Sequence, residues 1–160
     1  MLFEYFRAIP TIRFSLETTL APTVVSTGLT DFGAGRAEVW PNVDGEHFKL
    51  HEQGPGWADV TEGSSVAGGV WERERYTWDP AAGTVAIETT DSNTWGRGSR
   101  WDYRLEPTSA GTRVDVTVVR NPIGLKGRLI ALALTVAGTR MLRTQMEQAL
   151  SRISARSAGP

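Results

Sequence analysis

Residues 70–120 read VWERERYTWDPAAGTVAIETTDSNTWGRGSRWDYRLEPTSAGTRVDVTVVR. Three short turns, two of them containing Pro and all containing Gly, divide this stretch into four segments typical of strands. Consecutive strands joined by short turns pair antiparallel, so the stretch predicts an antiparallel meander. The predicted strands are roughly 70–78, 84–94, 99–106 and 112–120, and the turns are 79–83, 95–98 and 107–111.

Charged side chains suggest the register of this meander. If Trp78 faces Val85, and Leu105 faces both Ile87 and Val114, one face of the sheet carries a row of alternating charge, which favours cross-strand pairing. A slip of one residue would break that row, so we interpret this face as the solvent face. The row consists of Arg75, Glu88, Arg104 and Asp115.

The opposite face is then the buried one. It begins as an apolar core, but further along the strands carboxylates, hydroxyls and an arginine lie among aromatic side chains. Ionised groups are not left unpaired in a dry core, so this end of the sheet is predicted to line a partly wet cavity. The polar and aromatic side chains expected there are Glu72, Glu74, Tyr76, Thr89, Asp91, Trp101, Tyr103 and Arg120.

The flanking sequence supplies one short helix and one long helix. The short helix begins at Pro22, in the first helical turn, and is followed by a second helical turn within 34–40. The long helix follows a loop at 121–127 and runs to about residue 155. Further strands are expected at 12–18 and between 46 and 61.

The long helix is most apolar in its first half. Residues Leu129 to Ala137 are apolar nearly all round, so we expect burial on several sides. Gly138 is costly inside a helix, by about 1 kcal/mol relative to Ala. It therefore predicts either a close approach of another element or a bend.

Composition excludes several classes of function. The chain has 160 residues, the size of one domain, and 17 basic against 18 acidic side chains give a net charge of -1. This balance provides no basic field for a nucleic acid. The absence of cysteine excludes disulfides, iron–sulfur clusters and thiolate zinc sites. His47 and His51 would lie about 13 Å apart on a strand, so we expect no metal site.

These features resemble the START-like (SRPBCC) superfamily, in its polyketide cyclase/dehydrase and lipid-transport branch. The resemblance covers roughly residues 12–155. The motifs that show the resemblance are LETTLAPTVV (16–25), LTDF (29–32), WP (40–41), WERERY (71–76), DSN (91–93), GSRW (98–101), GTRV (111–114) and NP (121–122).

The resemblance implies an α+β helix-grip fold, with an antiparallel sheet of six or seven strands around the long C-terminal helix. It implies a hydrophobic tunnel between sheet and helix, whose mouth lies near the loop before that helix. The helix side of this tunnel is expected to be lined by Leu129, Leu132 and Val136. The expected organisation is a segment at 1–11, one ligand-binding domain at 12–155 and a tail at 156–160. No cofactor is expected.

Two functions fit this cavity. The first is binding of a small hydrophobic molecule, such as a lipid, a polyketide or an aromatic compound. The second is a polyketide aromatase/cyclase-like enzyme. No obvious acid–base pair stands out on the apolar lining, so we favour the binding protein. Glu72, Glu74 and Asp91 have three possible roles: they share protons in acid–base chemistry, they anchor the polar end of a ligand, or they are neutralised by Arg120, or another arginine, and water.

Two further expectations concern location and partners. No secretion signal or apolar stretch of transmembrane length is visible, so we expect a cytoplasmic protein. Residues 112–160 hold eight basic and two acidic side chains. They form either a solvated face or a weak contact with an anionic membrane surface. The apolar residues Leu2, Phe3, Tyr5 and Phe6 would favour self-association if they are exposed. We therefore expect either a monomer or a homodimer.

Overall fold

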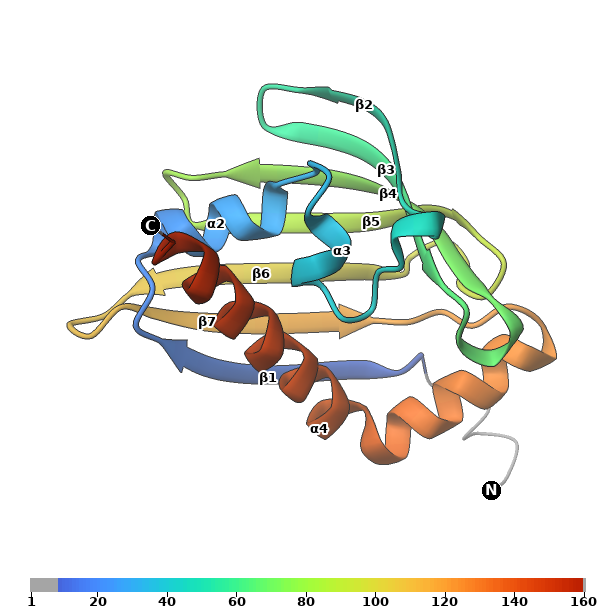
Figure 1. The fold of residues 1–160 in the computed structure, drawn as a ribbon. Coiled ribbons are helices and arrows are strands. Elements are labelled where there is room, and N and C mark those ends of the chain that lie inside the picture. Colours follow the sequence, from blue (N-terminus) through green and yellow to red (C-terminus); the bar gives the residue numbers. More distant parts are fainter. Residues whose placement is uncertain (1–8, 160) are drawn as a thin grey trace.

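The computed structural model describes residues 9–159, which form a seven-stranded antiparallel sheet with helices over one face (Figure 1). The predicted α+β helix-grip architecture is confirmed. The strands are β1 (Thr11–Thr18), β2 (Lys49–Gly54), β3 (Trp57–Ser64), β4 (Val70–Asp79), β5 (Thr84–Ser92), β6 (Arg100–Pro107) and β7 (Thr112–Val119). The helices are α2 (Pro22–Thr30), α3 (Arg36–Val39) and α4 (Gly124–Ser157), with 3-10 turns η1 (Gly45–His47) and η2 (Val66–Gly68).

The sheet runs in the order β1-β7-β6-β5-β4-β3-β2, so β1 crosses over to pair with the last strand. The inner faces of the strands supply the buried apolar side chains. In β1, for example, Ile12, Phe14 and Leu16 are buried and alternate with more exposed residues. The predicted apolar segment at Leu2–Phe6 lies outside the described residues.

The register of the meander is partly as predicted. Trp78 faces Val85 and Leu105 faces Val114, but Ile87 faces Trp101 instead of Leu105. The β5–β6 pairing is therefore shifted by four residues. A shift by an even number keeps every side chain on its predicted face.

Ser92 gives the physical reason for this shift. Its hydroxyl accepts hydrogen bonds from the backbone N–H groups of Thr94 and Trp95, at 3.0 Å and 3.1 Å. This local bonding is typical of turns initiated by serine, and it turns the chain before the Gly96–Gly98 stretch that suggested the hairpin tip. In the charged row, Glu88 consequently lies opposite Arg100 instead of Arg104.

A β-bulge in β5 overturns the placement of Asp91. The pairing jumps from Glu74↔Thr89 to Arg73↔Asp91, so one extra residue, Thr90, is inserted. An extra residue reverses the side-chain alternation beyond it. Asp91 is exposed and Ser92 is buried, so the prediction that Asp91 faces the cavity is wrong.

Helix α4 crosses the inner face of the sheet and bends between its two halves (Figure 1). Its second half is buried as expected, through Leu142, Met146, Leu150 and Ile153. The close approach predicted at Gly138 is also present, because a Cβ there would lie 2.7 Å from the Cδ1 atom of Ile12.

The first half of α4 is not buried on several sides. Leu129, Leu132 and Val136 are 60%, 61% and 83% exposed, so the prediction that they line the cavity is wrong. Another helix face, carrying Ala131 and Leu134, packs against the protein instead. An apolar composition on all sides does not identify the side that packs, and small residues permit the closest approach. No helix in residues 9–159 is long and apolar enough to cross a membrane.

Candidate functional site: a cavity between the sheet and helix α4

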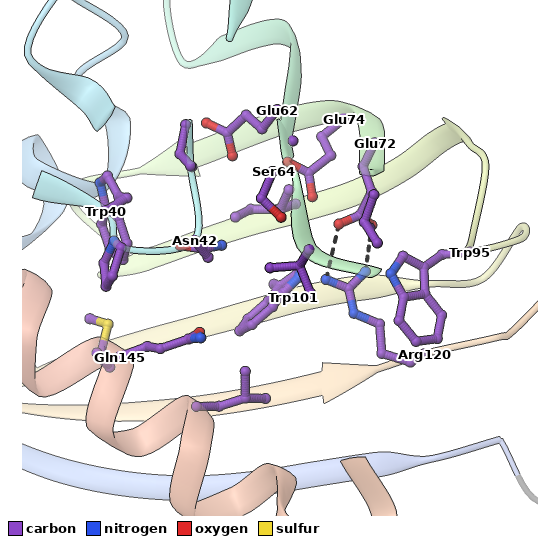
Figure 2. A pocket seen from close by; sticks show the side chains of 18 of the residues that line it. Trp40, Asn42, Glu62, Ser64, Glu72, Glu74, Trp95, Trp101, Arg120 and Gln145 are labelled. Atoms are coloured by element: carbon purple, nitrogen blue, oxygen red, sulfur yellow. Dashed lines mark hydrogen bonds and ion pairs between the residues drawn. The ribbon is translucent and has the colours of Figure 1, made fainter. Parts of the chain in front are cut away.

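A cavity of about 320 Å³ lies between strands β3–β6, Arg120 just after β7, helix α4 and the α3–η1 segment. Figure 2 shows its side chains projecting from the strands toward the helix. Its position agrees with the cavity inferred from the sequence. Of the predicted residues, those that line it are Glu72, Glu74, Tyr76, Trp101, Tyr103 and Arg120.

Glu72 and Arg120 form an ion pair at one end of the cavity (Figure 2). Arg120 donates from Nη1 to Oε1 at 2.6 Å and from Nη2 to Oε2 at 3.3 Å. The hydroxyl of Thr89 also donates to Oε1, at 3.0 Å. Thr89 therefore supports Glu72 and does not itself line the cavity. The two-point contact neutralises a carboxylate that would otherwise be costly to bury.

A second ion pair joins Glu62, on β3, to Arg36, on α3. The hydroxyl of Tyr76 connects the two, because it accepts from Arg36 Nη2 at 2.8 Å and donates to Glu62 Oε2 at 3.0 Å. Arg36 also donates to the backbone carbonyls of Leu29 and Asp31. Burial alone would lower the pKa of Arg36, but the neighbouring Tyr76 and Glu62 raise it, so Arg36 stays charged.

Glu74 lies between these two ion pairs and differs from both acidic neighbours. Its side chain is buried and has no arginine hydrogen bonded to it among the described residues. Burial raises the pKa of Glu74 well above its usual value, and the nearby Glu72 and Glu62 raise it further. Its surroundings therefore favour the protonated form of Glu74, in which the carboxyl group can donate a hydrogen bond.

Aromatic rings surround the charged groups. The guanidinium carbon of Arg120 lies 5.2 Å from the ring centre of Trp95 and 4.9 Å from that of Trp101. Trp101 stacks on Tyr103 with 6.3 Å between ring centres. Such contacts favour a cation held in a partly desolvated site. Burial also raises the pKa of the Tyr103 hydroxyl, which therefore stays protonated.

The wall opposite the carboxyl groups is mainly apolar. Helix α4 contributes Ile130, Leu134, Leu142 and Met146, while Phe14 and Leu29 extend the apolar surface from β1 and α2. The cavity thus has one polar end and one apolar wall. Pockets that bind small organic molecules combine apolar surface with a few fixed polar groups in this way.

Arg36 and Glu62 are cavity residues that the sequence analysis did not predict. The third strand was expected to end near Thr61, whereas it continues to Ser64. Ala58, Val60 and Glu62 follow its inward alternation, and Glu62 lies directly opposite Glu72. This alternation is a signal that could have found Glu62. Arg36 has no comparable signal, because it approaches from a four-residue helix far from the meander.

The histidines take no part in the cavity. His51 is exposed and shares a 2.6 Å hydrogen bond with the Thr61 hydroxyl, and His47 lies near Asp44 in η1. Within residues 9–159 there is no group of three or more His, Asp or Glu side chains placed to hold a metal ion.

Comparisons with known proteins give matches at the level of structure. No protein-family model and no curated protein matches the chain. The Zhui aromatase/cyclase from Streptomyces sp. R1128 is 17% identical with a TM-score of 0.77, over 95% of this chain and 98% of that chain. A protein from Thermus thermophilus is 16% identical with a TM-score of 0.76, over 93% of this chain and 100% of that chain.

A START superfamily protein from Mycobacterium smegmatis is 10% identical with a TM-score of 0.70. That match covers 91% of this chain and 97% of that chain. At such identities a structural likeness establishes the fold, while the chemistry of a site depends on its own residues.

Proposed function

Because the chain has the helix-grip fold of START-like proteins, we propose that it binds a small hydrophobic molecule in the cavity between the sheet and α4. The observation that carries this proposal is the pairing of charges at the polar end. Glu72 and Glu62 are each paired with an arginine, whereas the buried Glu74 between them has no ion pair within residues 9–159 and its pKa is raised by burial. The lining therefore combines apolar contact with a carboxyl group whose protonated form would donate a hydrogen bond to a ligand.

The apolar body of the ligand would lie against Ile130, Leu134 and Met146. Burial of apolar surface contributes roughly 25 cal/mol per Å², so this wall supplies most of the affinity. A carbonyl or hydroxyl oxygen of the ligand would accept the proton of Glu74. The volume of about 320 Å³ lies at the lower end of the range for small-molecule sites, which favours a compact ligand such as a polyketide or an aromatic compound.

A second candidate function is an aromatase/cyclase-like activity in the same cavity. It is favoured by the raised pKa of the buried Glu74 carboxyl and by the likeness to the Zhui aromatase/cyclase. In such a reaction, the proton of Glu74 would pass to a ketone oxygen of the polyketide substrate while another carbon of the same substrate attacks that carbonyl. The proton lost from the attacking carbon would return to Glu74 through water.

The remaining parts of the proposal follow from the cavity. Neither function requires a cofactor or a nucleic acid, and both are compatible with a monomer or a homodimer in the cytoplasm. Glu72, Tyr76, Trp101, Tyr103 and Arg120 are proposed to shape the polar end, while Thr89 holds Glu72 in place.

A matched pair of tryptophan variants tests the proposal. Ile130 lines the cavity, while the neighbouring Leu129 points away from it and is 60% exposed. The probe is a hydrophobic fluorescent dye, titrated by fluorescence. Ile130→Trp should weaken dye binding at least tenfold, whereas Leu129→Trp should leave it within about twofold of the unmodified chain. Equal affinity in both variants would place the dye outside the cavity and contradict the proposal.

A further inference from the structure

The first half of α4 carries an apolar surface that no other described element covers. Leu125, Leu129, Leu132 and Val136 are 75%, 60%, 61% and 83% exposed. Residues spaced at three and four positions share one side of a helix, so these four form a continuous stripe, here called the α4 stripe. The side that packs on the protein carries the small residues Gly127, Ala131 and Gly138, together with Leu134.

The charges around the α4 stripe all have one sign. Lys126 and Arg128 lie on the first half of the helix, Arg140 and Arg143 follow the stripe near the middle of the helix, and the sequence has no Asp or Glu between Asp115 and Glu147. Arg128 and Arg140 are exposed and form no ion pair with any residue in 9–159. The stripe is therefore apolar at its centre and cationic at its border.

The α4 stripe lies next to the place where the cavity reaches the surface. The Lys126 ammonium group donates to the carbonyl of Gly69, which ties this half of α4 to the η2 loop. Figure 1 shows the two segments side by side. Val66, in η2, lines the cavity although it is 65% exposed, and Ile130 of α4 also lines it.

We propose that the α4 stripe docks on an anionic lipid surface, with its leucines in the interface and its cations among the headgroups. Helices with an apolar side and a basic border bind membrane interfaces in this way. A second copy of this chain is a poorer occupant, because pairing two stripes would bring like charges together without any carboxylate between them. Docking would open the Val66–Ile130 side of the cavity toward the bilayer.

Vesicle co-flotation of the full chain tests this proposal. The vesicles are phosphatidylcholine with or without phosphatidylglycerol, at low salt and at about 0.5 M salt, where charge attraction is screened. The chain should float with the anionic vesicles at low salt and should be largely unbound at high salt. This readout needs no cavity ligand, so it can fail or succeed independently of the proposed function.

Two variants with matched controls locate the contact. Leu129→Asn/Leu132→Asn should weaken binding to anionic vesicles at least about tenfold, while Gln148→Asn/Ser151→Asn, on the second half of α4, should not. Arg128→Gln/Arg140→Gln should weaken it about tenfold, whereas Arg13→Gln/Arg104→Gln, with the same change in charge on the outer sheet face, should stay within about twofold. Circular dichroism checks that each variant is folded.

Three results would overturn the proposal. The first is no binding of the unmodified chain to anionic vesicles at low salt. The second is an equal loss in variants and controls, which would indicate attraction by net charge alone. The third is evidence that something other than a membrane covers the stripe. This evidence would be vesicle binding that emerges only after residues 2–8 are removed, or a dimer that the Leu129→Asn/Leu132→Asn variant abolishes. These last outcomes would identify another occupant of the stripe.

Discussion

Arg120 holds Glu72 through two contacts, 2.6 Å from Nη1 to Oε1 and 3.3 Å from Nη2 to Oε2. The arginine directly follows β7 and the glutamate lies on β4, so the pair spans the sheet at one end of the cavity. Trp95 and Trp101 flank the guanidinium group. Since water is largely excluded there, each charge depends on the other for its stability in the fold.

Removal of one partner should therefore cost more than removal of both. We expect Arg120→Met to lower the free energy of unfolding by about 3–5 kcal/mol, because it leaves Glu72 buried without its cation. The double variant Glu72→Gln/Arg120→Met should recover a large part of that loss. Urea denaturation of the single and double variants provides the measurement. Additive effects would show that the pair is not coupled.

The proton on Glu74 should appear in the pH dependence of stability. Its raised pKa means that the folded chain binds a proton that the unfolded chain releases above about pH 4.3. The stabilisation is thus complete below that pH and is lost as the pH rises through the folded-state pKa. The slope between the two pKa values is at most about 1.4 kcal/mol per pH unit.

Glu74→Gln removes this titration while it keeps a hydrogen-bond donor at the same place. Above about pH 4.3, the free energy of unfolding of the unmodified chain should fall relative to that of Glu74→Gln as the pH rises. The variant therefore gains stability relative to the unmodified chain. Comparing the two proteins cancels the opposite trend from Asp59 and Asp115, whose pKa values are lowered by hydrogen bonds from Arg73 and Ser15. A pH-independent difference would mean that Glu74 is ionised when folded.

The two cavity tyrosines should respond differently to loss of their hydroxyl groups. Tyr76→Phe removes the link between Arg36 and Glu62, so it should cost about 1–3 kcal/mol of stability. The Tyr103 hydroxyl has no hydrogen bond to any residue in 9–159, so Tyr103→Phe should change stability by less than about 0.5 kcal/mol. Thermal unfolding measures both. A larger loss for Tyr103→Phe would contradict this assignment of the network.

Gly127 sets the distance between α4 and the turn that follows β5. A Cβ atom at this position would lie 2.5 Å from the backbone oxygen of Thr94, which cannot rotate away. Gly127→Ala should therefore destabilise the protein by about 1–3 kcal/mol, although alanine favours a helix. Ser151→Ala, at an exposed position of the same helix, is the control and should be neutral or slightly stabilising in chemical denaturation.

The meander could be predicted from the sequence because its information is local. Turn residues and alternation place the four strands, and they put Glu72, Glu74, Trp101 and Tyr103 on the inner face. The errors arise where a single residue changes how the strands pair. The extra Thr90 moves Asp91 to the outer face, and the Ser92 turn shifts the β5–β6 pairing by four residues.

The other half of the cavity depends on contacts that local patterns do not encode. Arg36 reaches Glu62 and Tyr76 across 26 and 40 positions of the chain, so neither partner identifies the other. In α4, the leucine spacing predicts an apolar side, but the side that packs is the one with Gly127 and Ala131, since small residues allow the closest approach. Leu129, Leu132 and Val136 are left exposed as a result.

The most direct test of the proposed cavity function is native mass spectrometry of the chain purified from its own source, with Ile130→Trp purified in parallel. The proposal predicts a stoichiometric small hydrophobic adduct on the unmodified chain that is depleted in the variant, and solvent extraction would identify it. Conversion of that molecule during incubation would indicate the cyclase-like alternative. A bare chain, or an adduct equally abundant in both proteins, would contradict ligand binding in this cavity.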